Sequence, residues 1–219
     1  NDRVRHAELL EGPMKAELDE RLCTNHPRLF RDRHSDRMTT MTRGFECGDG
    51  WFDLIDVLSF EINRYADDGG LDVTAVQVKE KFGSLRFYER GGDAYVRGLT
   101  EMAMALSEQI CEECGQPGTL SGQGWRRTLC PDHGGPALPE GGVEGSDVLV
   151  RVDAPRWRHL ARALNVALER ASKSGGMPPV VVDEIVEGDD LSFRWHGGDA
   201  DGRTRAFFRL VEAYAATVR

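Results

Sequence analysis

The chain has 219 residues with 37 acidic and 28 basic side chains, which gives a formal net charge of −9 and a pI near 5.2. This balance argues against general charge-driven binding to nucleic acid, because such binding requires Lys and Arg to displace counterions from phosphate. A charged partner of so acidic a protein is expected to be basic. No run of 18 apolar residues occurs, which argues against a membrane span or a membrane partner.

The chain contains five cysteines, an odd number, and three of them stand in a metal-ligand pattern. This usage favours a reducing compartment over a disulfide framework. The first residues are polar and lack the apolar core of a signal peptide. We therefore expect a cytoplasmic protein.

The first 110 residues predict a helical arm followed by an α+β lobe. Residues 1–44 are charged and form the arm, with a helix near residues 7–22. The lobe comprises residues 45–110. Apolar residues at helical spacing predict its first helix, which ends at a Gly-Gly pair because glycine adopts the left-handed cap conformation without steric cost. Two strands joined by a short turn follow, and then a second helix. The expected inward anchors are Trp51, Leu54, Leu58 and Ile62 on the first helix and Val76, Val78, Leu85 and Phe87 on the hairpin.

Residues 111–135 predict a small zinc module. Its four ligands form a Cys-x2-Cys pair and, fifteen residues later, a Cys-x2-His pair: Cys111, Cys114, Cys130 and His133. Zinc prefers four such ligands at tetrahedral corners, and two short pairs from separate turns supply that geometry. Because all four corners are protein side chains, the Zn²⁺ ion is expected to be structural. A linker rich in Gly and Pro follows at residues 136–146.

Residues 147–219 predict a second α+β lobe that repeats the first. An offset of 106 aligns residues 157–200 with 51–94 without a gap, and 13 of the 44 positions are identical, including Trp51/Trp157 and Phe87/Phe193. We expect both aromatic pairs to be buried. The predicted fold class is therefore α+β, with two duplicated helix–β-hairpin–helix lobes joined by the zinc module.

Two other groups of residues could carry chemistry. A second metal site is conceivable at Cys23, His26 and Cys47, although lone cysteines are usually buried small hydrophobes. Three carboxylates could bind a divalent cation in a metal-dependent hydrolase or nuclease, namely Asp49, Asp53 and Asp56. More often such carboxylates favour a helix N-terminus. Because the histidines and cysteines offer no nucleophile with a base, the sequence favours a non-catalytic protein.

Three motifs resemble those of a family of uncharacterised proteins from phages, prophages and bacterial genomes. They are Cys-Gly-Asp-Gly-Trp at 47–51, Val-Lys-Glu-Lys-Phe-Gly-Ser-Leu-Arg-Phe-Tyr at 78–88, and the cysteine pair followed by Gly124-Trp125 and Thr128-Leu129-Cys130-x2-His133. The resemblance covers about residues 20–135. It implies a mobile-element context and supports the zinc site, but it implies no activity.

The charges of the two hairpins predict two different binding surfaces. Residues 77–90 carry four basic and two acidic side chains, whereas residues 183–196 carry five acidic side chains and one Arg. The leading hypothesis is a non-catalytic protein that binds another protein, as an immunity or counter-defence factor of a mobile element, through Glu187, Asp189 and Asp190. The alternative is a nucleic-acid-binding regulator that uses Lys79, Lys81, Arg86, Tyr88 and Arg90 with Arg126 and Arg127 of the zinc module.

Overall fold

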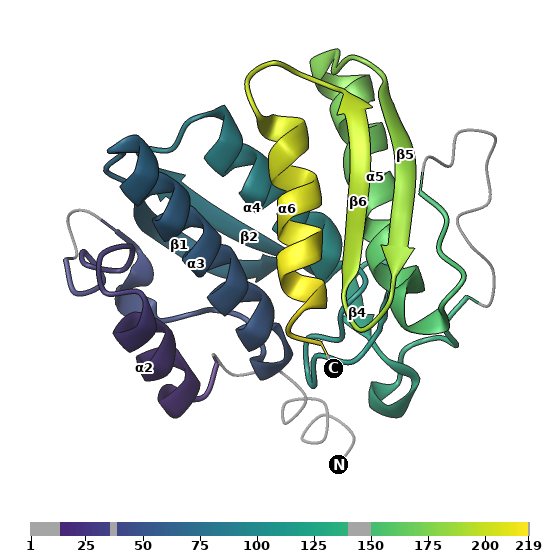
Figure 1. Cartoon of the computed structure of the whole chain (residues 1–219). Helices are drawn as coiled ribbons and strands as arrows, with labels where there is room; N and C mark the ends of the chain where they lie inside the picture. The colour runs from purple at the N-terminus through teal and green to yellow at the C-terminus, as the bar shows by residue number, and fades with distance from the viewer. Residues whose placement is uncertain (1–13, 36–38, 140–149, 219) are drawn as a thin grey trace.

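The protein has an α+β fold, seen in a computed structural model that describes residues 14–35, 39–139 and 150–218 (Figure 1). The helices are α2 (Ala16–Asn25), α3 (Phe52–Gly69), α4 (Ala94–Ser107), α5 (Arg158–Gly175) and α6 (Arg203–Ala215). The strands are β1 (Thr74–Lys81), β2 (Ser84–Arg90), β3 (Thr119–Ser121), β4 (Arg127–Leu129), β5 (Val180–Glu187) and β6 (Leu191–Gly197). They pair as three antiparallel hairpins, β1–β2, β3–β4 and β5–β6.

The two halves of the chain repeat one order of elements. A single 3-10 turn, at Asp49–Trp51 or Pro155–Trp157, leads into a helix, a hairpin and a second helix. The starts of the 3-10 turn, of the first helix and of the first strand each lie 106 residues apart in the two halves. Gly70 and Gly176 both cap the first helix in the left-handed conformation, with φ of 65° and 61°. The equal spacing is the one expected from the sequence alignment.

The two halves pack against each other through α4 and α6, which lie together at the centre of the molecule (Figure 1). At their crossing, a Cβ on Gly98 would lie only 2.8 Å from the carbonyl oxygen of Arg203, so the close approach requires glycine. Helix α3 contacts α6, and α5 contacts α4. Buried side chains of both halves therefore form one continuous core.

The arm covers the free edge of the first hairpin. Helix α2 packs on α3, and it ends at Asn25 rather than near residue 22; residues 1–13 of the arm lie outside the described part. The following segment runs beside β1, where the Thr40 N–H donates to the Val76 carbonyl and the Glu46 N–H to the Val78 carbonyl. This pairing satisfies backbone groups that an edge strand leaves open.

Two side chains that were predicted to be buried, Val76 and Phe193, are only half-buried. A β-bulge between Ala75 and Gln77 shifts the alternation of β1, so Ala75 is buried and Val76 is only half-buried. Trp51, Trp157 and Phe87 are buried as expected, but Phe193 is half-buried and packs edge-on against Phe208. Beyond residue 139, the predicted linker lies outside the described residues. No described helix is long and apolar enough to cross a membrane.

Candidate functional site

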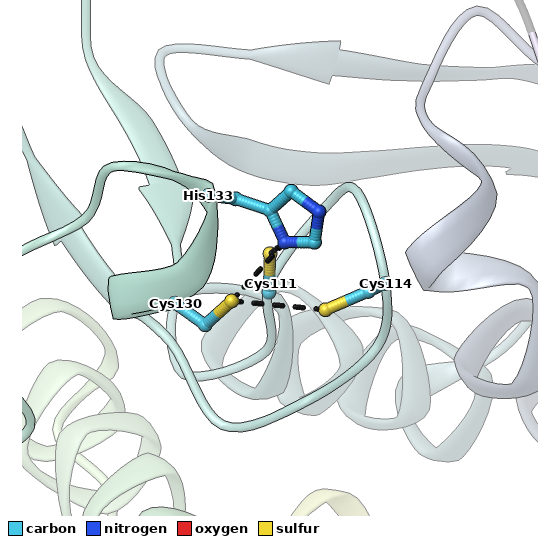
Figure 2. Close-up of side chains that lie close together, drawn as sticks. All are labelled: Cys111, Cys114, Cys130 and His133. Atoms are coloured by element: carbon cyan, nitrogen blue, oxygen red, sulfur yellow. Dashed lines mark hydrogen bonds between the residues drawn. The ribbon is translucent and has the colours of Figure 1, made fainter.

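The four predicted metal ligands lie together in the structure. Cys111 and Cys114 follow α4, Cys130 follows β4, and His133 lies in the 3-10 turn Pro131–His133 (Figure 2). Their ligand atoms all lie within 4.8 Å of one another. The Sγ atoms of Cys114 and Cys130 are 3.7 Å apart, and Nδ1 of His133 lies 3.7 Å from Cys111 Sγ and 3.2 Å from Cys130 Sγ.

These distances suit a tetrahedral metal ion. With metal–sulfur bonds of about 2.3 Å, two sulfurs at tetrahedral corners lie about 3.8 Å apart. Burial raises the pKa of the Cys130 thiol, but hydrogen bonds with His133, Cys111 and Cys114 together outweigh burial and bring it to about 7. Burial raises the pKa of Cys114 to about 12, so a metal would have to displace that proton. The described residues contain no other group of three or more His, Cys, Asp or Glu that could hold a metal ion.

The turns that carry the ligands are fixed by backbone hydrogen bonds. The Gly115 N–H donates to the Cys111 carbonyl, and the Gly134 N–H donates to the Pro131 carbonyl. Both glycines have φ near 80°, in the left-handed region that other residues rarely adopt. Each ligand pair is therefore held by a glycine turn that its own sequence specifies.

The Cys47–Trp51 motif binds the backbone of this cluster. The Gly48 N–H donates to Oε1 of Glu112 at 3.0 Å, and the Gly50 N–H donates to the Glu112 carbonyl at 2.7 Å. The indole N–H of Trp51 donates to the Ile110 carbonyl at 2.9 Å. A Cβ on Gly50 would collide with the backbone of Cys111 and of Gly115. The motif therefore joins the start of α3 to the Cys/His cluster.

Glu112 is buried in this junction. Burial raises the pKa of its carboxyl to about 7, and the hydrogen bond from Gly48 lowers it only in part. Its Oε1 accepts from Gly48, while Oε2 has no hydrogen-bond partner among the described residues. Spacing rules for metal ligands do not find such a residue, because its role is to bind the neighbouring backbone.

The second motif brings the β1–β2 tip to the β3–β4 hairpin. The Thr128 hydroxyl donates to the Gly83 carbonyl at 2.6 Å. A Cβ on Gly83 would collide with the Leu120 side chain and would lie 3.0 Å from the backbone nitrogen of Arg127. Beside this contact Phe82 adopts a φ of 57°, and its side chain is exposed.

The residues predicted to bind nucleic acid fall into two groups. Lys79, Lys81, Arg86 and Tyr88 share one face of the β1–β2 hairpin near its tip, and Arg126 adjoins Gly83 across the contact. Arg90 lies at the other end of β2 and pairs with Asp32 at 2.9 Å, while Arg127 pairs with Glu113 at 2.7 Å. The structure thus brings Lys79, Lys81, Arg86, Tyr88 and Arg126 to one region, five of the seven predicted residues.

The predicted acidic surface is only partly available. The Glu187 carboxylate accepts hydrogen bonds from the backbone N–H groups of Asp153 and Ala154, at 2.9 and 2.7 Å. Asp189 and Asp190 are exposed in the β5–β6 turn. Glu187 therefore holds the entry to α5, and the free carboxylates of this surface are those of the aspartates.

Asp190 also lines an open groove of about 700 Å³ between the two halves. The groove is bounded by the end of α2, by α3, by the start of β6 and by α6. The apolar side chains that line it include Val57, Phe60 and Leu191, and Phe60 is 56% exposed. Its ionised lining comprises four carboxylates and one guanidinium, namely Asp56, Glu61, Asp190, Glu212 and Arg209. Sequence reading could not find it, because its walls come from segments far apart in the chain.

The alternative chemical groups do not assemble. Asp49 pairs with Lys15 at 2.7 Å, and Asp56 lies 2.8 Å from Nε2 of His26. The other ring nitrogen of His26 lies 3.3 Å from the Asn63 amide, so both ring nitrogens have partners within the protein. The three carboxylates Asp49, Asp53 and Asp56 form no metal-holding group in the described chain, nor do Cys23, His26 and Cys47. Burial raises the pKa of both lone thiols, to about 11 for Cys23.

Comparisons with protein-family models, with curated proteins and with solved structures find no match to this chain.

Proposed function

We propose that the protein is a non-catalytic, zinc-stabilised binding protein that holds a segment of another protein in the groove between its two halves. The observation that carries the proposal is the groove itself, which is lined by apolar side chains and by more carboxylates than cations. The partner segment that suits it has an apolar or aromatic anchor flanked by Lys or Arg. The proposed setting, a mobile-element immunity or counter-defence factor in the cytoplasm, rests on the sequence resemblance alone.

Zinc is the metal that fits Cys111, Cys114, Cys130 and His133. Three thiolates and one imidazole are a common ligand set of structural zinc, and they leave no corner open for water or substrate. The ion would fix the module onto which the Cys47–Trp51 motif and the Gly83 turn dock. The metal then acts as a structural brace for the first half.

A duplicated origin of the two halves is supported by their common element order and by the 106-residue spacing. Duplication also accounts for the position of the groove. The junction of the two halves is lined by α3 of the first and by α6 and β6 of the second, so it combines surfaces that were free to diverge.

The charges favour a basic segment over an acidic one. Glu61 is bound by Arg209 in a bidentate pair at 2.6 and 2.9 Å and also by Arg64, so it offers no free charge to a partner. Asp190 forms no ion pair among the described residues, and the Asp56 side chain is 35% exposed. These carboxylates can approach a Lys or Arg while Phe60 and Leu191 bury the anchor.

The test uses fluorescein-labelled peptides with an aromatic anchor between lysines, and matched peptides in which glutamates replace the lysines. We expect binding of the lysine series only, measured by fluorescence anisotropy, with affinity that falls as salt rises. Phe60→Ala and Asp190→Lys should each weaken binding about tenfold, which corresponds to about 1.4 kcal/mol.

Asp189→Lys is the matched control, because Asp189 is exposed beside Asp190 but does not line the groove. Equal losses for the two aspartate variants would show that only the general charge matters. Failure of every lysine peptide to bind would reject the groove as a peptide site.

A further inference from the structure

The contact between the β1–β2 tip and the zinc module creates a second exposed surface, separate from the groove. It presents three aromatic side chains, Phe82, Tyr88 and Trp125, which are 61%, 45% and 74% exposed. Large aromatic side chains are normally buried, so three exposed rings on two hairpins that contact each other indicate a binding role. Phe82 keeps a left-handed φ of 57°, a conformation that is uncommon for a bulky residue and occurs often at functional sites.

Cations surround these rings. The Lys79 ammonium lies 5.9 Å from the centre of the Tyr88 ring, and the Lys81 ammonium lies 5.4 Å from that of Phe82. Arg126 is exposed between Trp125 and the docked Gly83 turn. None of these three cations forms a salt bridge with a described carboxylate, although acidic residues outnumber basic ones in the chain.

We infer that this aromatic and basic surface binds single-stranded nucleic acid. Exposed rings stack on unpaired bases, and neighbouring cations contact the phosphates, which is how sequence-tolerant single-strand binders work. A duplex keeps its bases stacked on each other, so the rings would find no partner there. Because the chain has a net charge of −9, the rest of its surface repels phosphate. Binding should therefore be confined to this patch and should depend strongly on salt.

The surface is held in place from both sides. The Thr128–Gly83 hydrogen bond fixes the β1–β2 tip against β4, and the Cys/His cluster adjoins the base of the β3–β4 hairpin. Such fixing lowers the conformational entropy that binding would otherwise lose. None of these residues lines the groove, so the nucleic-acid surface can be tested independently of the proposed peptide site.

The test measures fluorescence anisotropy of a labelled oligothymidylate of about 12 nucleotides with the zinc-loaded full chain. Trp125→Ala and Phe82→Gly should each weaken binding about tenfold, and Lys81→Ala should weaken it and reduce its salt dependence. Glycine is chosen at position 82 because it accepts the left-handed φ, so the variant removes the ring without new backbone strain. Zinc content and circular dichroism of each variant verify the fold.

Phe60→Ala is the matched control, since it removes an exposed ring from the groove instead. It should leave oligothymidylate binding unchanged, and a duplex of the same length should compete poorly. The inference is overturned if the oligonucleotide does not bind, if the tip variants bind it normally, or if the duplex binds equally well. Loss of lysine-peptide binding in Trp125→Ala, with no oligonucleotide binding, would assign the surface to a protein partner.

Discussion

Glu112 links the Cys/His cluster to the Cys47–Trp51 motif through both its side chain and its backbone. It follows a ligand directly, and it binds Gly48 through its carboxylate and Gly50 through its carbonyl. A glycine is needed at position 50 because the backbone of the cluster lies where a Cβ would stand. The Gly-Asp-Gly-Trp sequence is therefore explained by contact with residues 110–115.

At the scale of single residues, Cys114→Ser tests the zinc site. Cys114 is exposed, so the substitution removes a ligand without disturbing core packing. We expect one zinc per chain in the native protein and less than about half an equivalent in the variant, measured by elemental analysis after dialysis without chelator. The variant should also unfold at a lower urea concentration, because metal binding to the folded state stabilises it.

Cys23→Ser is the matched control, because Cys23 is a lone thiol outside the cluster. It should keep the full zinc content. Zinc retention by Cys114→Ser, or zinc loss from Cys23→Ser, would contradict the proposed ligand set.

The clustering of Cys111, Cys114, Cys130 and His133 could be predicted from the sequence, because short Cys-x2-Cys and Cys-x2-His pairs fix their own geometry locally. Glu187 could not be placed in the same way. Its charge and its position in a hairpin are those of a solvated residue, yet its carboxylate accepts two backbone N–H groups at the entry to α5. That role depends on a segment 33 and 34 residues away, which no local pattern records.

Among the elements, helices and hairpins follow from periodicity and from the glycine caps at Gly70 and Gly176. The bulge in β1 does not, because the sequence Ala75-Val76-Gln77 carries no glycine to mark it. The arm segment beside β1 uses the Val76 carbonyl three times, from Thr39 Oγ1, Thr40 N and Thr40 Oγ1. Tertiary pairing thus decides which β1 side chains enter the core.

The two tryptophans that begin the first helix of each half offer a matched test at the element scale. Trp51 donates its indole N–H to Ile110, whereas the Trp157 indole nitrogen is buried with no acceptor in the described chain. Replacement by Phe removes similar volume from both sites. Trp51→Phe should therefore cost about 1–2 kcal/mol more than Trp157→Phe, because it breaks a hydrogen bond and leaves a buried carbonyl short of a donor.

Urea unfolding followed by circular dichroism measures this difference. Zinc content should remain unchanged in Trp157→Phe, which lies outside the zinc module. Equal losses of stability, or a larger loss for Trp157→Phe, would show that the Trp51–Ile110 bond does not hold α3 to the module.

At the scale of the whole molecule, three ion pairs join the two halves around the α4–α6 contact. Glu61 pairs with Arg209, Glu108 with Arg170 at 2.8 Å, and Glu101 with Arg203 at 2.6 Å. Sequence alignment gives the same element order in both halves but not how the halves meet. That arrangement depends on the packing of Gly98 against α6, and it determines both the shared core and the groove.

Glu61→Gln tests whether the halves fold as one unit. The Glu61 side chain is 1% exposed and accepts hydrogen bonds from Arg64 and Arg209. Burial raises the pKa of its carboxyl, but the two arginines outweigh burial and lower it below 4.5. Its contribution to stability is therefore present at neutral pH and declines as the pH falls below about 4.5.

We expect Glu61→Gln to lower the free energy of unfolding by about 1–3 kcal/mol at pH 7, because it replaces the charged acceptor of two part-exposed guanidinium groups by a neutral amide. The loss should shrink at acidic pH, where the native carboxylate is itself protonated. Glu169→Gln is the control, since Glu169 forms an exposed pair with Lys173 on one helix and should leave the urea midpoint essentially unchanged. One urea transition, the same by circular dichroism and by tryptophan fluorescence, is expected for the native chain and both variants, because α4 and α6 share a core. Two separate transitions in the native chain would mean that the halves are independent folding units and that the Glu61–Arg209 pair only joins them.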